Sequence, residues 1–192
     1  MVGLGNPGER YAATRHNVAW WVLGSLAERW RGTDTSVAGV YMARQATVGG
    51  VSVALMQPST FMNLAGQAVE RWRHEHPGEP EDLLVVSDDV YLPLGTLRLR
   101  ARGSSGGHKG LESIEAALGS REFARLRIGV GAAPSGAELR THVLESFSAE
   151  ERPRVEEAVG RAADAVACWV AEGILPAMNR FNRRDAKEVQ EP

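Results

Sequence analysis

The sequence predicts a single α/β domain in which helices flank a mixed β-sheet. Short apolar or alternating segments, typical of strands, take turns along the chain with segments whose apolar residues recur at helical spacing. The chain has 192 residues, of which 43% are hydrophobic and 24% are charged. This length and composition suffice for one domain with a substantial core and are ordinary for a soluble globular protein.

The strands are predicted from short segments bounded by turn residues. Residues 83–86 (LLVV) are wholly apolar, which is typical of a strand buried on both faces. Residues 96–100 alternate leucine with arginine, as a half-exposed strand does, and the pair Gly49-Gly50 marks a turn between two strands. In chain order, the expected strands are residues 2–4, 39–46, 51–57, 83–86, 96–100 and 126–130.

The helices are predicted from apolar residues that recur along one stripe. The longest stripe runs through residues 155–170, and an earlier helix ends before Pro77, because proline disfavours a helical residue in front of it. Residues 1–182 are expected to form the domain, followed by a frayed polar tail at 183–192. In chain order, the expected helices are residues 16–30, 63–76, 111–118, 155–170 and 176–182.

Several classes of protein are excluded by composition. No stretch approaches the roughly 20 apolar residues of a membrane helix, and the N-terminus lacks the features of a signal peptide. Cys168 is the only cysteine, which excludes an internal disulfide and fits a reducing cytoplasm, where we expect the protein to act. The formal net charge is −2, yet residues 94–140 carry eight bases and four acids, a local charge of +4. Such a region can bind a polyanion, although ordinary surface variation explains it equally well.

Four segments at the ends of predicted elements carry residue types that do chemistry, at the positions where α/β proteins place active sites. The first is residues 3–8 (GLGNPG) with His16 shortly after it. This loop lacks the Gly-Lys-Ser/Thr ending of a phosphate-binding P-loop, and a lone histidine is more often structural than catalytic. The second is residues 57–63 (QPSTFMN), in which Asn63 can donate to a carbonyl group or simply cap the next helix.

The other two segments offer a carboxylate and a basic loop. Asp88 follows the most hydrophobic strand, where it can accept the Nδ1 proton of a histidine and fix the tautomer of the ring; two solvated loop acids are the alternative. Residues 98–109 hold four bases and one histidine among small residues, with no acid. They suit an anion-binding loop or a mobile lid, and equally a plain disordered loop.

Two common chemistries find little support. There is no cysteine pair and no HExxH for a metal ion, and no Gly-x-Ser-x-Gly elbow for a serine nucleophile. A histidine, an aspartate and several amides remain. That set suits the activation of a water molecule by a general base.

Taken together, these segments resemble the bacterial peptidyl-tRNA hydrolase family. Each motif alone is weak, but their order and spacing agree from Val2 to about Asn182, which makes the combination specific. The matching stretches are residues 2–8 (VGLGNPG), Tyr11, 14–17 (TRHN), 57–63 (QPSTFMN), 88–89 (DD) with 92–93 (LP), 103–110 (GSSGGHKG) and 126–131 (LRIGVG).

The resemblance implies a monomer with a twisted mixed sheet flanked by helices. It implies hydrolysis of the ester between a peptide and the 3′ end of tRNA, which recycles tRNA from prematurely released peptidyl-tRNA, with no metal or cofactor. His16 would be the general base and Asp88 would orient it. Asn6 and Asn63 would position the peptide and the ester.

The resemblance also implies contacts with the acceptor stem and CCA end of the substrate. Arg100 and Arg127 match basic positions that clamp the tRNA 5′-phosphate, and Met62 would line the cleft. Phe61 lies in the same motif, where we expect it to pack. The residues expected to bind substrate are Tyr11, Phe61, Met62, Arg100, His108, Lys109 and Arg127.

Two positions depart from the family pattern. Lys109 follows His108 where many members have asparagine, and lysine cannot accept a hydrogen bond but adds a positive charge. We expect activity to be retained, with Lys109 either steering the acidic tRNA end or stabilising the oxyanion. Ala19 replaces a usual glycine, which we expect to affect only helix packing. The strand before Gly3 is short, so we expect that a few N-terminal residues are missing from this start.

Two other functions compete with peptidyl-tRNA hydrolysis. One is a non-catalytic RNA-binding relative of the same fold, which the unusual Lys109 allows but retention of the four catalytic positions disfavours. The other is hydrolysis of a different small ester or amide, which the basic positions at Arg100 and Arg127 disfavour.

Overall fold

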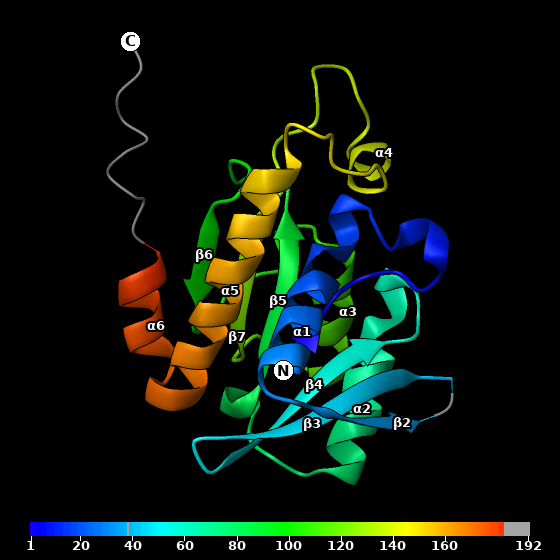
Figure 1. The fold of residues 1–192 in the computed structure, drawn as a ribbon. Helices are drawn as coiled ribbons and strands as arrows, with labels where there is room; N and C mark the ends of the chain where they lie inside the picture. Colours follow the sequence, from blue (N-terminus) through cyan, green and yellow to red (C-terminus); the bar gives the residue numbers. More distant parts are fainter. Residues whose placement is uncertain (38, 183–192) are drawn as a thin grey trace.

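A computed structural model describes residues 1–37 and 39–182, and the strands in this part of the chain form one mixed sheet (Figure 1). The sheet order is β2-β3-β4-β1-β5-β7-β6. Strands β4, β1, β5 and β7 run parallel, whereas β2, β3 and β6 pair antiparallel to their neighbours. The strands are β1 Val2–Gly3, β2 Thr33–Val37, β3 Tyr41–Val48, β4 Val51–Pro58, β5 Leu84–Asp89, β6 Leu97–Arg100 and β7 Ala124–Gly129.

Helices cover both faces of the sheet, which confirms the predicted fold class. Helices α1 and α5 cross the front face in Figure 1, and α2 and α3 pack on the other face. The helices are α1 Val18–Arg29, α2 Ala65–Glu75, α3 Lys109–Leu118, α4 Leu139–Val143, α5 Arg152–Glu172 and α6 Ile174–Phe181, with short 3-10 turns η1 Glu9–Tyr11, η2 Arg15–Asn17, η3 Met62–Leu64 and η4 Pro80–Asp82.

The sheet separates two hydrophobic cores. One lies under α1, α5 and α6, and the other lies under α2 and α3. Strand β5 is buried along its whole length, as its apolar sequence predicts, because helices cover both of its faces. Representative core residues are Val22, Leu26, Leu126, Ile128 and Val166 in the first core, and Leu4, Met62, Val85, Leu111 and Phe123 in the second.

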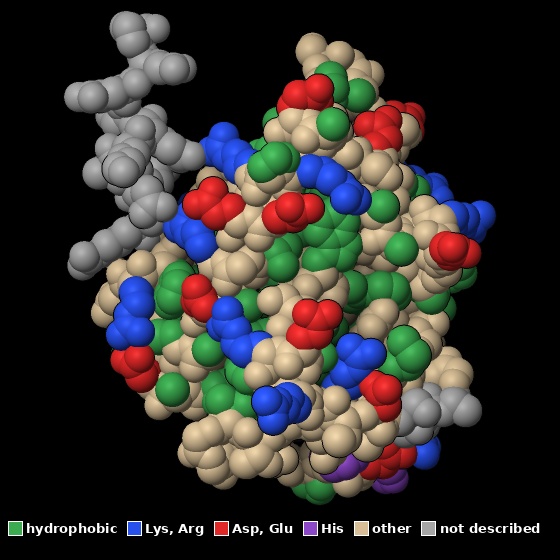
Figure 2. Space-filling view, in the orientation of Figure 1, with side chains coloured by type: hydrophobic (Ala, Val, Ile, Leu, Met, Phe, Trp, Pro, Cys, Tyr) green, Lys and Arg blue, Asp and Glu red, His purple; other side chains and the backbone are tan. Residues whose placement is uncertain are grey.

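The outer surface of the α1–α5 layer carries charges of both signs. In Figure 2, Lys and Arg side chains lie among Asp and Glu side chains across this face, without a large area of one sign. A polyanion therefore finds no extended positive surface on this side of the molecule.

The predicted elements are present, with two additions. Strand β2 (TDTSV) was not predicted because its residues are mostly polar, and it pairs with β3 at the edge of the sheet. Helix α4 was not predicted because five residues give too few apolar positions for a stripe. The predicted tail at 183–192 lies outside the described residues. Among the described helices, none has the length and apolarity to cross a membrane.

The parallel strands position the functional site. Because β1, β4, β5 and β7 point the same way, the segments that follow them meet at one edge of the sheet. The loop after β1, the turn η3 after β4 and the end of β5 all lie at this edge, and they are the segments in which the sequence places its polar residues.

Close packing of α2 on α3 gives a prediction for stability. A methyl group on Gly66 would collide with the backbone carbonyl of Ser113, whereas one on Gly24, in α1, would meet nothing within 4 Å. We expect Gly66→Ala to lower the free energy of unfolding by about 1–3 kcal/mol. The matched control Gly24→Ala should raise it by about 0.5–1 kcal/mol, because alanine favours a helix interior. Urea denaturation tests both, and equal effects would refute the close contact.

Candidate active site

A cleft of about 800 Å³ opens at the carboxyl edge of the parallel strands. Its walls come from the loop after β1, η2, η3, the end of β5, the loop before α3 and the segment around α4. Of the predicted site residues, all except Arg100 line this cleft. They are Asn6, Tyr11, His16, Phe61, Met62, Asn63, Asp88, His108, Lys109 and Arg127.

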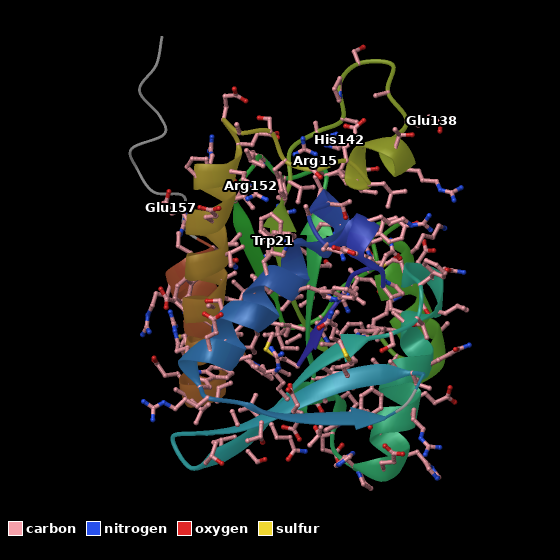
Figure 3. The ribbon with its side chains drawn as sticks, turned by 45° about the vertical axis from the view of Figure 1, so that its right-hand side comes forward. Arg15, Trp21, Glu138, His142, Arg152 and Glu157 are labelled. Carbon is pink, nitrogen blue, oxygen red and sulfur yellow. The ribbon has the colours of Figure 1, made fainter. Side chains whose placement is uncertain are left out.

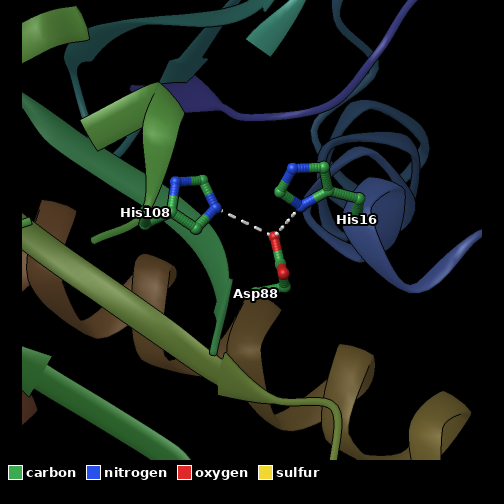
Figure 4. A group of neighbouring side chains, drawn as sticks. All are labelled: His16, Asp88 and His108. Carbon is green, nitrogen blue, oxygen red and sulfur yellow. Dashed lines mark hydrogen bonds and ion pairs between the residues drawn. The ribbon is translucent and has the colours of Figure 1, made fainter. Parts of the chain in front are cut away.

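His16 and Asp88, 72 residues apart in sequence, meet in this cleft. His16 lies in η2 just before α1, and its Nδ1 is 2.7 Å from Oδ1 of Asp88 at the end of β5 (Figure 4). A carboxylate accepts a hydrogen bond, so the proton of the neutral ring is on Nδ1 and the lone pair is on Nε2. Among the described residues, Nε2 has no hydrogen-bond partner, and the ring lines the cleft.

Asp88 is ionised although it is buried. Its side chain is 2% exposed, and burial by itself acts to raise the pKa of the carboxyl. The His16 and His108 rings outweigh this effect through charge and hydrogen bonding, and they hold the pKa of Asp88 well below its usual range. Asp88 therefore remains a carboxylate throughout the neutral pH range.

His108 contacts the same carboxylate oxygen from the other side of the cleft. Its Nε2 is 3.0 Å from Oδ1 of Asp88 (Figure 4). Its Nδ1 accepts the backbone N–H groups of Gly110 at 3.2 Å and Leu111 at 3.3 Å, so that the ring caps α3. The sequence predicts His108 only as a substrate-binding residue and gives no sign of this contact with Asp88.

The three side chains also resemble a metal-binding set, since one ligand atom from each lies within 4.8 Å of the others. Metal ligation through Nε2 of His108 would move the ring proton to Nδ1. That proton would then face the N–H groups of Gly110 and Leu111, two donors that now point at a lone pair. The hydrogen bonds thus favour a carboxylate–imidazole cluster over a metal centre, and the absence of a metal stays a prediction.

Asn6 is fixed in the loop after β1 by its side-chain oxygen. Oδ1 accepts the backbone N–H of Met62 at 2.9 Å, so the other end of the amide, Nδ2, is a donor at the cleft wall. Asn17, which is fully buried, holds the same loop: it accepts the Asn6 N–H at 2.8 Å and donates to the Asn6 carbonyl at 2.9 Å. Asn17 was not among the predicted site residues, although it lies in the matching stretch 14–17.

The wall opposite the loop before α3 combines apolar and amide side chains. Asn63 is exposed at the cleft and does not cap α2, which has no side-chain cap among the described residues, so the capping alternative is wrong. Met62 is buried beneath it. The expectation that Phe61 packs inside is also wrong. Phe61 is 49% exposed and lines the cleft, because it lies immediately before the turn η3. Its ring contacts the ring of Tyr11 edge-on, with the two ring centroids 6.5 Å apart.

Arg127 is largely committed to contacts within the protein. It donates to Oδ2 of Asp89 at 3.0 Å and to the carbonyl oxygens of Ser104 at 2.7 Å and Ser105 at 3.0 Å, and its side chain is 15% exposed. Arg127 therefore holds the loop before α3 against the end of β5. The sequence motif contains Asp89, but only the structure reveals this ion pair.

Arg100 lies outside the cleft on the same side of the sheet as Arg127. Arg98 pairs directly with Arg127 across the β6–β7 ladder, and Arg100 lies two residues further along β6. Residues two apart on a strand share a face, so Arg98, Arg100 and Arg127 form a row. In the described part of the chain, Arg98 and Arg100 are exposed and have no ion-pair partner.

Lys109 is the first residue of α3 and lies at the mouth of the cleft. Its side chain is 70% exposed, and Nζ is 2.9 Å from a carboxylate oxygen of Glu112. An ion pair this exposed contributes little to stability, so the lysine can exchange partners readily.

The remaining wall is the segment around α4, which contributes Leu139, Arg140, Val143 and Leu144. Buried Arg15 fixes it with two hydrogen bonds to Glu151, at 2.9 and 3.0 Å, and a third to the Val130 carbonyl. His142 donates to the Gly131 carbonyl at 3.0 Å, and Figure 3 shows Arg15 and His142 between the start of α1 and α4. Because Arg15 precedes His16, this anchor also positions the His16 ring.

A carboxylate-held imidazole at the parallel edge of an α/β sheet, facing an open cleft, is an arrangement typical of hydrolases. Comparisons with known proteins agree. The family model described as peptidyl-tRNA hydrolase matches residues 1–189. A peptidyl-tRNA hydrolase of Chloroflexus aggregans is 46% identical over 183 residues, covering 95% of this chain and 97% of that protein.

Another relative and a solved structure extend the match. A peptidyl-tRNA hydrolase of Symbiobacterium thermophilum is 44% identical over 95% of this chain and 97% of its own length. The crystal structure of peptidyl-tRNA hydrolase from Acinetobacter baumannii superposes with a TM-score of 0.89 at 33% identity, covering 96% of this chain and 94% of that chain. This chain belongs to the peptidyl-tRNA hydrolase family.

The contacts of Arg127 predict the order of the loop before α3. Arg127→Ala should increase amide hydrogen exchange in residues 103–108 about ten- to hundredfold, because charge-assisted hydrogen bonds contribute about 1.5–3 kcal/mol each to keeping such a loop closed. Arg98→Ala, across the ladder and without an ion-pair partner in the described chain, is the matched control and should leave exchange unchanged. Equal protection in the parent and Arg127→Ala would contradict the bracing role.

Proposed function

We propose that this chain hydrolyses the ester between the carboxyl end of a peptide and the 3′ ribose oxygen of tRNA. The observation that carries the proposal is the His16 ring, held through Nδ1 by a buried carboxylate while Nε2 is left without a partner among the described residues. Membership of a family named for this reaction supports the choice of substrate.

In the proposed mechanism His16 is the general base. Its Nε2 takes a proton from a water molecule as the water oxygen attacks the ester carbonyl carbon. When the carbon–oxygen bond to the ribose breaks, the imidazolium returns the proton to the leaving 3′ oxygen, so that the products are a free peptide and tRNA. Asp88 keeps the lone pair on Nε2 and stabilises the imidazolium in between. General-base assistance of this kind is worth about 10²–10⁴-fold in rate.

Asn6 and Asn63 are the proposed donors to the substrate carbonyl. Nδ2 of Asn6 is directed by the bond that fixes its oxygen, and Asn63 is exposed in the cleft beside it in η3. One well-aligned donor to an oxyanion contributes about 10²–10³-fold. Neither the base nor the donors require a metal or cofactor, which supports the prediction that none takes part.

The peptide is proposed to lie along the aromatic wall. Phe61 and Tyr11 expose apolar ring surface at the cleft, with Met62 beneath them. Contacts of this kind are tolerant of sequence, which suits an enzyme that meets many different nascent peptides.

The tRNA end is proposed to lie on the row of arginines and at the mouth of the cleft. Arg100 is unpaired among the described residues, so it is better placed than Arg127 to take a 5′-phosphate of the acceptor stem, and Arg127 is proposed to hold the loop that presents the site. Lys109 is proposed to attract the tRNA end, because its exposed ammonium lies at the rim. Its pairing with Glu112 supports this role over an oxyanion contact.

A non-catalytic RNA-binding role is not favoured. A buried carboxylate that fixes the tautomer of an imidazole in a cleft serves general-base chemistry, and RNA binding has no need of it. The proposal includes action as a monomer and a cytoplasmic location, where translation releases peptidyl-tRNA.

The central test is an assay with N-acylated aminoacyl-tRNA. His16→Ala should lower kcat by about 10²–10⁴-fold, with KM nearly unchanged, because it removes only the base. The parent should spare free aminoacyl-tRNA, which lacks the peptide bond beside the ester. Hydrolysis by His16→Ala at the parent rate would exclude His16 from the mechanism.

Contacts with tRNA are tested by salt dependence. Arg100→Ala and Lys109→Ala should each raise KM severalfold, leave kcat largely intact and reduce the slope of log KM against log salt by about 1, because each removes a phosphate contact. Arg44→Ala, on β3 toward the opposite edge of the sheet, is the control. If Lys109→Ala hydrolyses the substrate as well as the parent at every salt concentration, Lys109 has no such role.

A further inference from the structure

His108 occupies a position where three parts of the site meet. It ends the loop 103–108, precedes α3 and contacts the catalytic carboxylate. We propose that His108 is a positioning residue whose single ring joins α3 to Asp88, so that the His16–Asp88 pair is completed only when the loop and the helix are in place. This inference rests on the proposed function and assigns His108 a role other than substrate binding.

The first step of the argument is the tautomer of His108. Two backbone donors, the N–H groups of Gly110 and Leu111, point at Nδ1, so this atom must carry the lone pair. The only proton of the neutral ring is then on Nε2, which donates to Asp88. The role of one ring nitrogen therefore sets the role of the other. Because the cap of α3 keeps the lone pair on Nδ1, the proton is on Nε2 and can be donated to Asp88.

The second step concerns the shared oxygen. His16 and His108 both donate to Oδ1 of Asp88, at 2.7 and 3.0 Å, and their rings lie 5.1 Å apart (Figure 4). A carboxylate oxygen that accepts two donors is a weaker partner for either one. The donation from His108 therefore draws negative charge from the oxygen that His16 contacts, and removal of His108 would leave that charge to His16 alone.

Of the described side chains, only those of His16 and His108 form hydrogen bonds with the Asp88 carboxylate, because the charged groups next to them in the sequence are paired elsewhere. Asp89 is paired with Arg127, and Lys109 with Glu112. Among the described residues, His16 and His108 are the groups that lower the pKa of Asp88. In the part of the chain that the structure describes, the remaining titratable groups along the cleft walls are Tyr11 from η1, Tyr91 just after β5 and Arg140 from α4.

The third step is the path of the loop. Gly106 and Gly107 have φ values of 61° and 82°, which bring the chain sharply round so that the next residue faces Asp88. Upstream, Arg127 holds the carbonyls of Ser104 and Ser105. The loop is thus fixed at both ends on the edge of β5, by Arg127 to Asp89 and by His108 to Asp88.

Two substitutions of His108 separate the contribution of Nδ1, which caps α3, from that of Nε2, which donates to Asp88. In His108→Asn the amide oxygen takes the place of Nδ1 and keeps the helix cap, but nothing reaches Asp88. In His108→Gln the longer side chain places an N–H group near the position of Nε2 and keeps the donor to Asp88, but the cap is lost. The pair therefore distinguishes a structural role from a role in positioning the dyad.

The experiment measures kcat/KM against pH for the parent and both variants, together with an NMR titration of the His16 ring without substrate. His108→Asn should lose some stability with its donor to buried Asp88, and it should shift the acid limb of the pH profile and the midpoint of the His16 titration upward by about 0.5–1 pH unit, with kcat/KM at pH 6 reduced about three- to tenfold. His108→Gln should keep both midpoints and unfold at lower urea concentration.

Two results would overturn the inference: a parental His16 titration in His108→Asn, or equal shifts in both variants. The NMR titration needs no substrate. Failure of the proposed function, seen as parental hydrolysis by His16→Ala, is therefore distinguishable from failure of this inference, seen as an unshifted His16 titration.

Discussion

A buried carboxylate shared by two imidazole rings is the constraint on which the site depends. Asp88 lies near the end of β5, a strand that is buried along its whole length, where an unpaired charge would cost several kcal/mol. The rings of His16 and His108 supply two N–H donors to one oxygen, so the charge is stabilised only if η2 and the start of α3 are both in place. The same contacts that make burial tolerable also fix the tautomers, which leaves Nε2 of His16 facing the cleft.

Two further ion pairs, Arg15 with Glu151 and Arg127 with Asp89, hold the walls of the cleft. Arg15 reaches Glu151 and the Val130 carbonyl and so ties η2 to the segments on either side of α4. Arg127 reaches Asp89 and the loop before α3. Each pair joins segments that are far apart in sequence, and each has one partner immediately beside a member of the dyad. The walls of the cleft and the geometry of the His16–Asp88 pair are therefore held by the same interactions.

Much of this arrangement could be predicted from the sequence, because apolar runs and the regular spacing of apolar residues are visible within each short segment of the chain. The apolar run of β5 predicts a central strand, and a carboxylate directly after it predicts a partner for a histidine. The polar β2 and the five-residue α4 give no such signal, since pairing with β3 and anchoring by Arg15 stabilise them. The role of Asn17 and the two-sided contacts of His108 depend on loop geometry, which residue types alone do not encode.

The most direct test of the account is a crystal structure with a non-hydrolysable analogue, in which an amide replaces the ester between an acylated amino acid and the 3′ end of adenosine. The account predicts that the carbonyl carbon lies near Nε2 of His16 with a water molecule between them, and that the carbonyl oxygen accepts a hydrogen bond from the Asn6 side chain. An analogue bound in the cleft with its carbonyl beyond the reach of that water, or facing away from the His16 ring, would contradict it.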